Sequence, residues 1–457
     1  MRKNYDVVVI GAGISGLSLS HFLQKKRPDL ELVMLEKGER SGGAIRSFNK
    51  GGFLAEWGPH GFLDNSPYSR EILLDTGLDQ EAQQAPLEDF HRYICHRGTL
   101  IRIPQKPASI LTSPLLSFPG KIRVLKDFWI EPVESDQTVG QWAARRFGKG
   151  VLPLVDAALT GSYAGDYEKL SIDAVMPGIR SLEFEHGSVL KGLLKIMRKK
   201  SGQEKAMPAM KNFPQGMERL IQVLAKDKAI RLETEVGALS KKDGKWEITA
   251  STGTFYAANL VMALPVNAAL KLLCPLSVPP VIEVPLSRIY NAVLGFSPRA
   301  RVPYGFGYLA PEVEKRFTLG VMFSSQMFPG RAPGDNILLE ALVGGRRHPE
   351  RLELDDETII REVYKDISNL MELPEPPFFS EVLRPEAAIP QLEKDHPDLL
   401  EWRSNMETRE EGLYICGFGW DGIGINDMIK SARRVADDLA AGQKAGGQKA
   451  EVKPVYF

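Results

Sequence analysis

The strongest constraint on this chain is a glycine-rich turn between an apolar run and a helix-forming segment near the N-terminus. The β-branched run 6–10 is followed directly by Gly11-Ala12-Gly13-Ile14-Ser15-Gly16. In a strand–turn–helix unit the first glycine permits a tight turn, the second lets a pyrophosphate approach the backbone, and the third lets the helix pack closely on the strand. A second apolar run ends in Glu36, where a carboxylate can hold ribose hydroxyls and would repel a 2′-phosphate. The order of these elements predicts a dinucleotide site.

The length and the charge of the chain limit the classes of protein to which it can belong. A chain of 457 residues can bury a large core and divide into two or three domains. Lys plus Arg and Asp plus Glu are both 58, so the surface lacks the positive charge that a nucleic-acid binder needs. Three widely spaced cysteines provide neither a disulfide framework nor a CxxC metal site, which indicates a reduced, cytoplasmic setting. We expect no cleavable signal peptide and no membrane span, so that any membrane contact would be peripheral.

The residues after Glu36 favour FAD over NAD. The stretch 36–47 contains Arg40, Gly42 and Gly43 in the pattern ExxxRxGGxxxS. It resembles flavoproteins related to amine oxidases, whose arginine and glycine pair lie along the FAD diphosphate. In flavoproteins of this type a loop like Gly58-Pro59-His60-Gly61 passes the flavin ring, although an ordinary Gly-Pro turn would have the same sequence. Because the sequence places no carboxylate or nucleophile beside His60, we interpret this histidine as part of the cofactor loop.

The order of the patterns predicts an α/β fold assembled from discontinuous segments. We expect a Rossmann-like FAD-binding domain, an α+β substrate domain built on an antiparallel sheet, and a mostly helical insertion. The predicted segments are 1–88, 213–275 and 401–442 for the FAD-binding domain, 89–105 and 276–400 for the substrate domain, 106–212 for the insertion and 443–457 for a tail. The helix that follows 422–427 is expected to direct its N-terminus at the flavin.

One helix of the insertion is both basic and amphipathic. Apolar residues recur at helical spacing between Val189 and Met197, and lysines and an arginine occupy the other side. Two interpretations remain open. The helix either packs its apolar side on the protein with a solvated charged face, or it rests on a membrane and admits an apolar substrate.

Four stretches carry a more specific resemblance that covers nearly the whole chain. They are 161–171, with the sequence G-S-Y-A-G-D-Y-E-K-L-S, and the stretches 40–47, 305–309 and 422–427. Together they resemble the protoporphyrinogen oxidases, the FAD enzymes that aromatise protoporphyrinogen IX to protoporphyrin IX in haem synthesis. The phrase G-x-Y-A-G-D-x-x-x-L-S is more specific than GxGxxG, because amine oxidases of the same fold lack it.

The resemblance implies a set of site residues. The cofactor contacts fall on Gly11, Ala12, Gly13, Ile14, Ser15, Gly16, Glu36, Gly58, Pro59, His60, Gly61 and Val236, with Ile423, Gly424 and Ile425 at the flavin. The substrate contacts fall on Arg92 with Tyr93, on Gly307 and Leu309 in the wall opposite the macrocycle, and on Gly161. Flavin N5 performs the chemistry, so no catalytic side chain and no metal are expected. Three two-electron rounds would reduce three O2 to H2O2.

Several alternatives remain open at this point. The same chemistry on coproporphyrinogen III would give coproporphyrin III, but its four propionates would require more cationic residues around the cleft. A flavin amine oxidase could use Phe418 and Trp420 as half of an aromatic cage. A further alternative is a non-catalytic flavoprotein, or a membrane-docking partner of a neighbouring haem enzyme. The sequence does not decide between a monomer and a homodimer, between a free cytoplasmic enzyme and one bound peripherally to the inner membrane, or whether a ferrochelatase-like partner receives the product.

Overall fold

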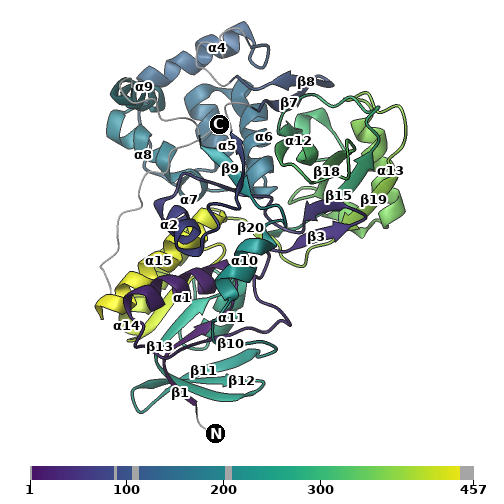
Figure 1. Ribbon diagram of the computed structural model, residues 1–457. Coiled ribbons are helices and arrows are strands. Elements are labelled where there is room, and N and C mark those ends of the chain that lie inside the picture. The colour runs from purple at the N-terminus through teal and green to yellow at the C-terminus, as the bar shows by residue number, and fades with distance from the viewer. Residues whose placement is uncertain (1–2, 87–89, 105–112, 201–207, 443–457) are drawn as a thin grey trace.

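The computed structural model describes residues 3–86, 90–104, 113–200 and 208–442 of the chain (Figure 1). The predicted tail 443–457 lies outside the described residues.

A seven-stranded sheet forms the lower half of the molecule (Figure 1). Its strands are β1 (Lys3–Ile10), β2 (Leu32–Leu35), β10 (Ile230–Arg231), β11 (Val236–Lys242), β12 (Lys245–Ala250), β13 (Gly253–Ala263) and β21 (Leu413–Cys416). The order is β10-β2-β1-β13-β12-β11, and β21 pairs with the last residues of β13. The strands β10, β2, β1, β13 and β21 are parallel, and β11, β12 and β13 form an antiparallel meander.

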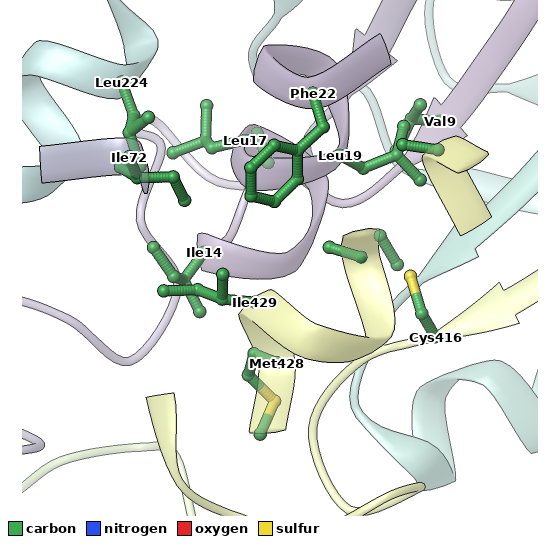
Figure 2. Close-up of a cluster of buried hydrophobic side chains, with 14 of the residues drawn as sticks. Val9, Ile14, Leu17, Leu19, Phe22, Ile72, Leu224, Cys416, Met428 and Ile429 are labelled. Atoms are coloured by element: carbon green, nitrogen blue, oxygen red, sulfur yellow. The ribbon is translucent and has the colours of Figure 1, made fainter. Parts of the chain in front are cut away.

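Helices cover both faces of this sheet, which explains why the last four residues of β1, 7–10, form an unbroken apolar run. Val7 and Val9 lie in a cluster with α1 (Ile14–Lys26), α10 (Glu218–Ala225) and α15 (Ile425–Ala441). Figure 2 shows part of this cluster, in which Ile14 of α1 lies beside Ile429 of α15. Val8 and Ile10 face α11 (Val266–Leu273) and α14 (His396–Arg409) on the other side. The predicted α/β class is confirmed.

A second seven-stranded sheet forms the part that we expected to bind the substrate. Its order is β19 (Phe379–Leu383), β15 (Ile289–Phe296), β18 (Ile337–Gly344), β17 (Gly320–Met322), β16 (Gly307–Leu309), β7 (Arg92–His96) and β8 (Thr99–Arg102). All neighbouring strands in this sheet are antiparallel except β16 and β7, which are parallel. We expected an antiparallel sheet from the sequence and did not predict this parallel pair. Helix α13 (Asp356–Ile367) covers one face through Ile359, Val363 and Ile367. The other face packs on Phe53–Glu56 through Val293 and Leu338, and on the helical insertion through Ile94 and Leu309.

The helical insertion packs around its own apolar core at the top of the view in Figure 1. Its elements are α4 (Phe118–Leu125), η1 (Lys126–Trp129), α5 (Val139–Phe147), η2 (Lys149–Val151), α6 (Leu152–Tyr163), α7 (Ile172–Val175), α8 (Pro177–His186) and α9 (Val189–Lys200). Among the described residues, no helix is both long enough and apolar enough to cross a bilayer.

Smaller elements connect these parts. They are β3 (Ser47–Lys50), β4 (Phe53–Glu56), β5 (Phe62–Leu63), α2 (Pro67–Thr76), β6 (Gln83–Pro86), β9 (Ala209–Asn212), β14 (Leu286–Ser287), η3 (Glu312–Glu314), α12 (Ser324–Met327), η4 (Pro349–Glu353) and β20 (Ile389–Pro390). Strand β9 pairs with both β5 and β6, so the end of the insertion returns to the first segment of the chain.

Buried charges fix the helices of the insertion to one another. Arg146 of α5 has no exposed surface, donates to Asp127 Oδ1 at 3.0 Å and lies 2.9 Å from Glu183 Oε1. Burial alone would raise the pKa of Glu183, but hydrogen bonds from Arg145, Trp142 and Arg180 and the charge of Arg146 outweigh it and lower the pKa to about 2. Glu183 therefore stays ionised inside the insertion at neutral pH.

We expect Arg146→Met to lower the free energy of unfolding by about 3 kcal/mol, because it leaves two buried carboxylates without a shared cation. Urea unfolding followed by circular dichroism measures the change. The matched control is Arg70→Met, at an exposed arginine of α2, which should change stability by no more than about 0.5 kcal/mol. Equal effects of the two substitutions would contradict a structural role for the cluster.

Candidate active site

The three glycines of the first turn have different surroundings. Gly11 has a φ of +101°, and a Cβ there would lie 2.6 Å from the carbonyl oxygen of Ala263 on β13. A Cβ on Gly16 would lie 2.1 Å from the carbonyl oxygen of Gly11. Gly13 has no atom within 4 Å of its Cβ position, and no side chain caps α1 there. The first and third glycines thus allow backbones to meet, and the second opens a space before a helix N-terminus, as phosphate binding requires.

The second glycine turn lies against the first. Gly42 N donates to Ala12 O at 2.8 Å. Arg40 donates through Nη1 and Nη2 to the carbonyl oxygens of Ser41, Ile45 and Gly43, at 3.0, 3.1 and 2.8 Å. The observed contacts of Arg40 are therefore with its own loop, which the guanidinium holds in shape beside the open space at Gly13.

Glu36 occupies the position that the sequence spacing predicted. Its carboxylate accepts hydrogen bonds from Ala12 N at 2.9 Å and from Gly38 N at 3.0 Å. A carboxylate has about four lone-pair positions, so two remain for ribose hydroxyls. Thr234 N donates to the backbone oxygen of Glu36 at 2.8 Å, which brings the start of β11 at Val236 to the same end of the site.

The loop 58–61 and the N-terminus of α15 meet at the other end. A Cβ on Gly58 would lie 2.2 Å from Ala44 O, and one on Gly61 would lie 2.7 Å from Lys211 O. The loop therefore fits closely between the second glycine turn and β9. Asn426 Nδ2 donates to Leu63 O at 2.8 Å, which holds the first turn of α15 beside β5.

The expected cofactor residues thus come together from five separate parts of the chain. They are the turn of Gly11, Ala12, Gly13, Ile14, Ser15 and Gly16; the stretch with Glu36, Arg40, Gly42 and Gly43; the loop of Gly58, Pro59, His60 and Gly61; Val236; and Ile423, Gly424 and Ile425 before and at the start of α15.

Three of the expected substrate residues, Arg92, Gly307 and Leu309, lie on the face of the second sheet that is turned away from α13. Arg92, Gly307, Met322 and Glu340 are in register across β7, β16, β17 and β18 and therefore share this face. We call these four residues the wall row. Leu309 lies two positions after Gly307 on the same face, and a Cβ on Gly161 of α6 would lie 2.8 Å from its Cδ1.

Gly307 must be a glycine for the wall to form. Its φ is +141°, and a Cβ would lie 2.1 Å from Val321 O on the next strand. Helix α6 thus approaches this face at Gly161, which packs on Leu309, whereas Gly307 lets β16 lie close to β17.

The structure does not bring Tyr93 to this face. Because strand side chains alternate, Tyr93 points to the side opposite Arg92. Its hydroxyl donates to Tyr304 O at 3.0 Å, and its ring packs with the cluster that contains Phe323. The sequence pair Arg92-Tyr93 is divided between the two faces of the sheet.

The aromatic cage of the amine oxidase alternative is not formed by the residues proposed for it. Trp420 has no exposed surface and lies in the core between the first sheet and α14. Phe418 packs against the cluster of α1 and α15. Trp420 is therefore a packing residue.

Sequence reasoning missed a group of buried polar residues beside the loop 58–61. Glu340 Oε2 lies 2.9 Å from His60 Nε2, although 280 positions separate the two residues. Arg331 Nη1 donates to Glu56 Oε1 at 2.8 Å, also in the interior. The available signal was a glutamate inside each of two apolar strands, Phe53–Glu56 and Ile337–Gly344, because a buried carboxylate needs partners.

A scan against family models matches residues 14–440 to the flavin containing amine oxidoreductases. The coproporphyrinogen III oxidase of Bacillus subtilis (strain 168) is 27% identical, over 94% of this chain and 97% of its own length. The chloroplastic protoporphyrinogen oxidase of Nicotiana tabacum is also 27% identical, over 95% of this chain and 85% of its own length.

Solved structures agree with this match. The crystal structure of a provisionally named protoporphyrinogen oxidase from Exiguobacterium sp. 255-15 has a TM-score of 0.80 at 23% identity, covering 97% of this chain and 100% of that chain. A match of this extent to a family model, joined to turns and helix ends arranged to receive a dinucleotide, shows that the chain belongs to the flavin containing amine oxidoreductases and that its cofactor is FAD.

Proposed function

We propose that this enzyme oxidises protoporphyrinogen IX to protoporphyrin IX with FAD as cofactor and O2 as electron acceptor. The observation that carries the proposal is the wall row, which places Arg92 on one face with Gly307, beside Leu309 and Gly161. Relatives that align with nearly the whole chain are named for the oxidation of protoporphyrinogen or coproporphyrinogen.

The chain offers a distinct contact to each part of FAD. The open space at Gly13 and the positive end of α1 suit the diphosphate. The free lone pairs of Glu36 suit the ribose, and the backbone at Val236 suits the adenine. When bound, FAD takes a hydride from the substrate, which is the difficult step of the oxidation.

The wall suits a large apolar ring that carries propionates. Leu309 and Met322 supply apolar surface beside Arg92 for such a ring. Burial lowers the pKa of the Arg92 guanidinium, but an arginine keeps its charge in proteins. A half-buried guanidinium can bind a propionate with two parallel hydrogen bonds, which fixes the orientation of the ring.

The aromatisation removes six electrons. We propose three rounds, each of which removes two electrons and reduces one O2 to H2O2, so that three O2 are consumed for each product molecule.

Coproporphyrinogen III is the second candidate substrate. The observation that favours it is the Bacillus subtilis relative, which bears that name and matches this chain as well as the tobacco relative does. Four propionates would need cations in addition to Arg92. Among the described residues of the wall row, Arg92 is the one cation, and this favours the substrate with two propionates.

We propose further that the helical insertion touches an anionic membrane. Apolar side chains are exposed on α4, η1, α8 and α9; they are Phe118, Ile122, Leu125, Trp129, Phe184, Leu193, Leu194 and Met197. We call this set the apolar surface. Phe118 and Trp129 are 75% and 78% exposed, and Figure 1 shows α4, α8 and α9 together at one end of the molecule.

The charge around the apolar surface supports this contact. Lys126, Lys191, Lys195 and Arg198 are exposed on the same elements. The apolar side of α9 is thus only partly packed on the protein, since Leu194 and Met197 remain 43% and 48% exposed. Basic residues beside exposed apolar residues are typical of helices that bind anionic lipid.

The first test of the cofactor site compares two alanine substitutions. Gly13→Ala should leave the unfolding temperature of the apoprotein unchanged, because its Cβ meets nothing and its φ of −76° suits any residue. It should weaken FAD binding about tenfold or more, because the methyl group fills the space that the diphosphate needs. Gly16→Ala should instead destabilise the apoprotein, since its Cβ meets the Gly11 carbonyl. Isothermal titration with FAD and a thermal scan measure both effects, and unchanged FAD affinity in Gly13→Ala would contradict the site.

The test of the reaction is a fluorescence assay of porphyrin formation in air, with protoporphyrinogen IX and coproporphyrinogen III offered separately. We expect a higher kcat/KM for protoporphyrinogen IX and three O2 consumed for each product. Arg92→Met should raise KM about tenfold or more with little change in kcat, because a charged hydrogen bond to the propionate is lost. The matched control is Arg102→Met, since Arg102 is in register with Tyr93 on the far face.

Each other outcome of this assay has a defined meaning. A higher kcat/KM for coproporphyrinogen III would select the second candidate. An unchanged KM in Arg92→Met would exclude Arg92 as the anchor. No turnover of either substrate would refute the proposed reaction.

The membrane contact is tested by sedimentation with vesicles that contain anionic lipid. The double substitution Trp129→Glu with Leu194→Glu should abolish sedimentation at low salt, because it places negative charge in the centre of the apolar surface. The control Val278→Glu changes a residue that is 76% exposed in the loop after α11, and it should bind like the wild type. Wild-type protein that stays in the supernatant at low salt would refute the contact.

A further inference from the structure

Two fully buried glutamates meet where the first segment of the chain touches the second sheet. Glu56 ends β4, Glu340 lies within β18, and the side chain of each is 1% exposed. Glu56 N donates to Glu340 Oε2 at 3.4 Å, so the two residues are in direct contact. Each carboxylate therefore needs its own source of positive charge or of hydrogen bonds.

The negative charges of the two glutamates are compensated by different partners. Glu56 pairs with Arg331, which is always charged. Glu340 accepts hydrogen bonds from Ser324 Oγ and Asn291 Nδ2, both at 2.6 Å, and its one titratable partner among the described residues is His60. Burial alone would raise the pKa of Glu340, but the charge of His60 and the hydrogen bonds outweigh it and lower the pKa to about 2. Independently of the charge of His60, both oxygens of Glu340 accept hydrogen bonds from neutral donors, so the carboxylate acts as an acceptor toward the ring.

This arrangement fixes the tautomer of His60. Because Glu340 is an acceptor, His60 Nε2 must carry a hydrogen to bond with it at 2.9 Å. Neutral His60 then has its lone pair on Nδ1, so that the ring can accept a proton at this atom alone. A carboxylate that holds one ring nitrogen also raises the basicity of the other nitrogen.

His60 is also the accessible member of the group. Its side chain is 17% exposed, whereas Glu56, Glu340 and Arg331 are exposed by 2% or less. His60 lines one small cavity with Met322 and Glu340, which are two residues of the wall row. The ring therefore lies at the end of the row opposite Arg92, three strand spacings or about 14 Å away.

We propose that His60 accepts the proton that each round of oxidation releases from the substrate, and that Glu340 is the positioning residue that prepares it. The inference rests on the proposed function. In each round the macrocycle would lose a hydride, with two electrons, from a meso carbon to FAD, and one pyrrole N–H proton to His60 Nδ1. The product has lost four meso hydrogens and two N–H hydrogens, so the ring also tautomerises and moves one meso hydrogen to a nitrogen. The imidazolium is stabilised by the Glu340 carboxylate and returns the proton to solvent from its exposed side before the next round.

The neighbouring charges favour the uptake and release of a proton by His60. The Glu340 carboxylate attracts the imidazolium, and the positive charge of Arg331 is neutralised by Glu56. Asn291 and Ser324 are neutral donors that hold Glu340 in place whether or not His60 is protonated. The protein thus changes charge at one ring without rearranging the buried group.

The tautomer is tested first by NMR of the FAD-loaded protein labelled with 15N-histidine. The chain has seven histidines, and His60→Gln identifies the signal of His60. We expect neutral His60 to carry its hydrogen on Nε2, because Glu340 accepts from this atom. A neutral form with hydrogen on Nδ1 would overturn the proposal.

The pH profile of kcat/KM is the second readout. For the wild type, activity should fall on the acid side as His60 becomes protonated, and His60→Gln should remove this fall and lower kcat about 100-fold. Glutamine keeps an N–H donor for Glu340, so the buried group should survive, which a thermal scan verifies. The matched control is His348→Gln, which changes a histidine 2.9 Å from Glu312 Oε2 outside the wall, and it should preserve the profile.

The results distinguish this inference from the proposed function. Porphyrinogen turnover with the same pH profile in wild type and His60→Gln would overturn the role of His60 alone. No porphyrinogen turnover by the wild type would overturn both the reaction and the proton-accepting role.

Discussion

The close approach of backbones at the first glycine turn is the contact on which the remaining structure depends. At Gly11 the turn passes against β13, and at Gly16 the helix α1 passes against the turn itself, at distances that a single methyl group would close. These two contacts set the path of α1 over the sheet, where it packs on α15. They also leave an open space at Gly13, directly before the N-terminus of α1. A ligand can bind in this space, because no side chain caps the helix there. The cofactor site therefore depends on how closely the turn packs on β13 and α1 packs on the turn.

Local patterns predicted this part of the molecule well, because its determinants lie within a few residues of one another. Glycine spacing located the turn, and the apolar runs located β1 and β2. The helix α2 begins after Ser66 and ends at Gly77, which has a left-handed conformation that glycine adopts without strain. The resemblance to flavoproteins then supplied residues such as Val236, which no local pattern could have placed beside Glu36.

The parts that could not be predicted depend on contacts between distant segments. No spacing rule relates His60 to Glu340, so the histidine was interpreted as a loop residue, and the buried partner became visible only in the folded chain. The pair Arg92-Tyr93 was treated as one unit, but strand alternation separates the two side chains. The exposure of Leu194 and Met197 depends on how α9 packs on its neighbours, which periodicity leaves open.

The parallel pairing of β7 with β16 has a consequence for how the protein matures. Residues 92 and 307 are direct neighbours in the sheet, so synthesis must continue through more than 200 further positions before β7 can complete this edge. Parallel pairing across so long a separation has a high loop-closure cost and is slow to form. Until then the early hairpin presents apolar residues such as Ile94, which become buried in the finished protein. A nascent chain of this kind needs protection at the ribosome, and shortened products that stop before β16 should be prone to aggregate.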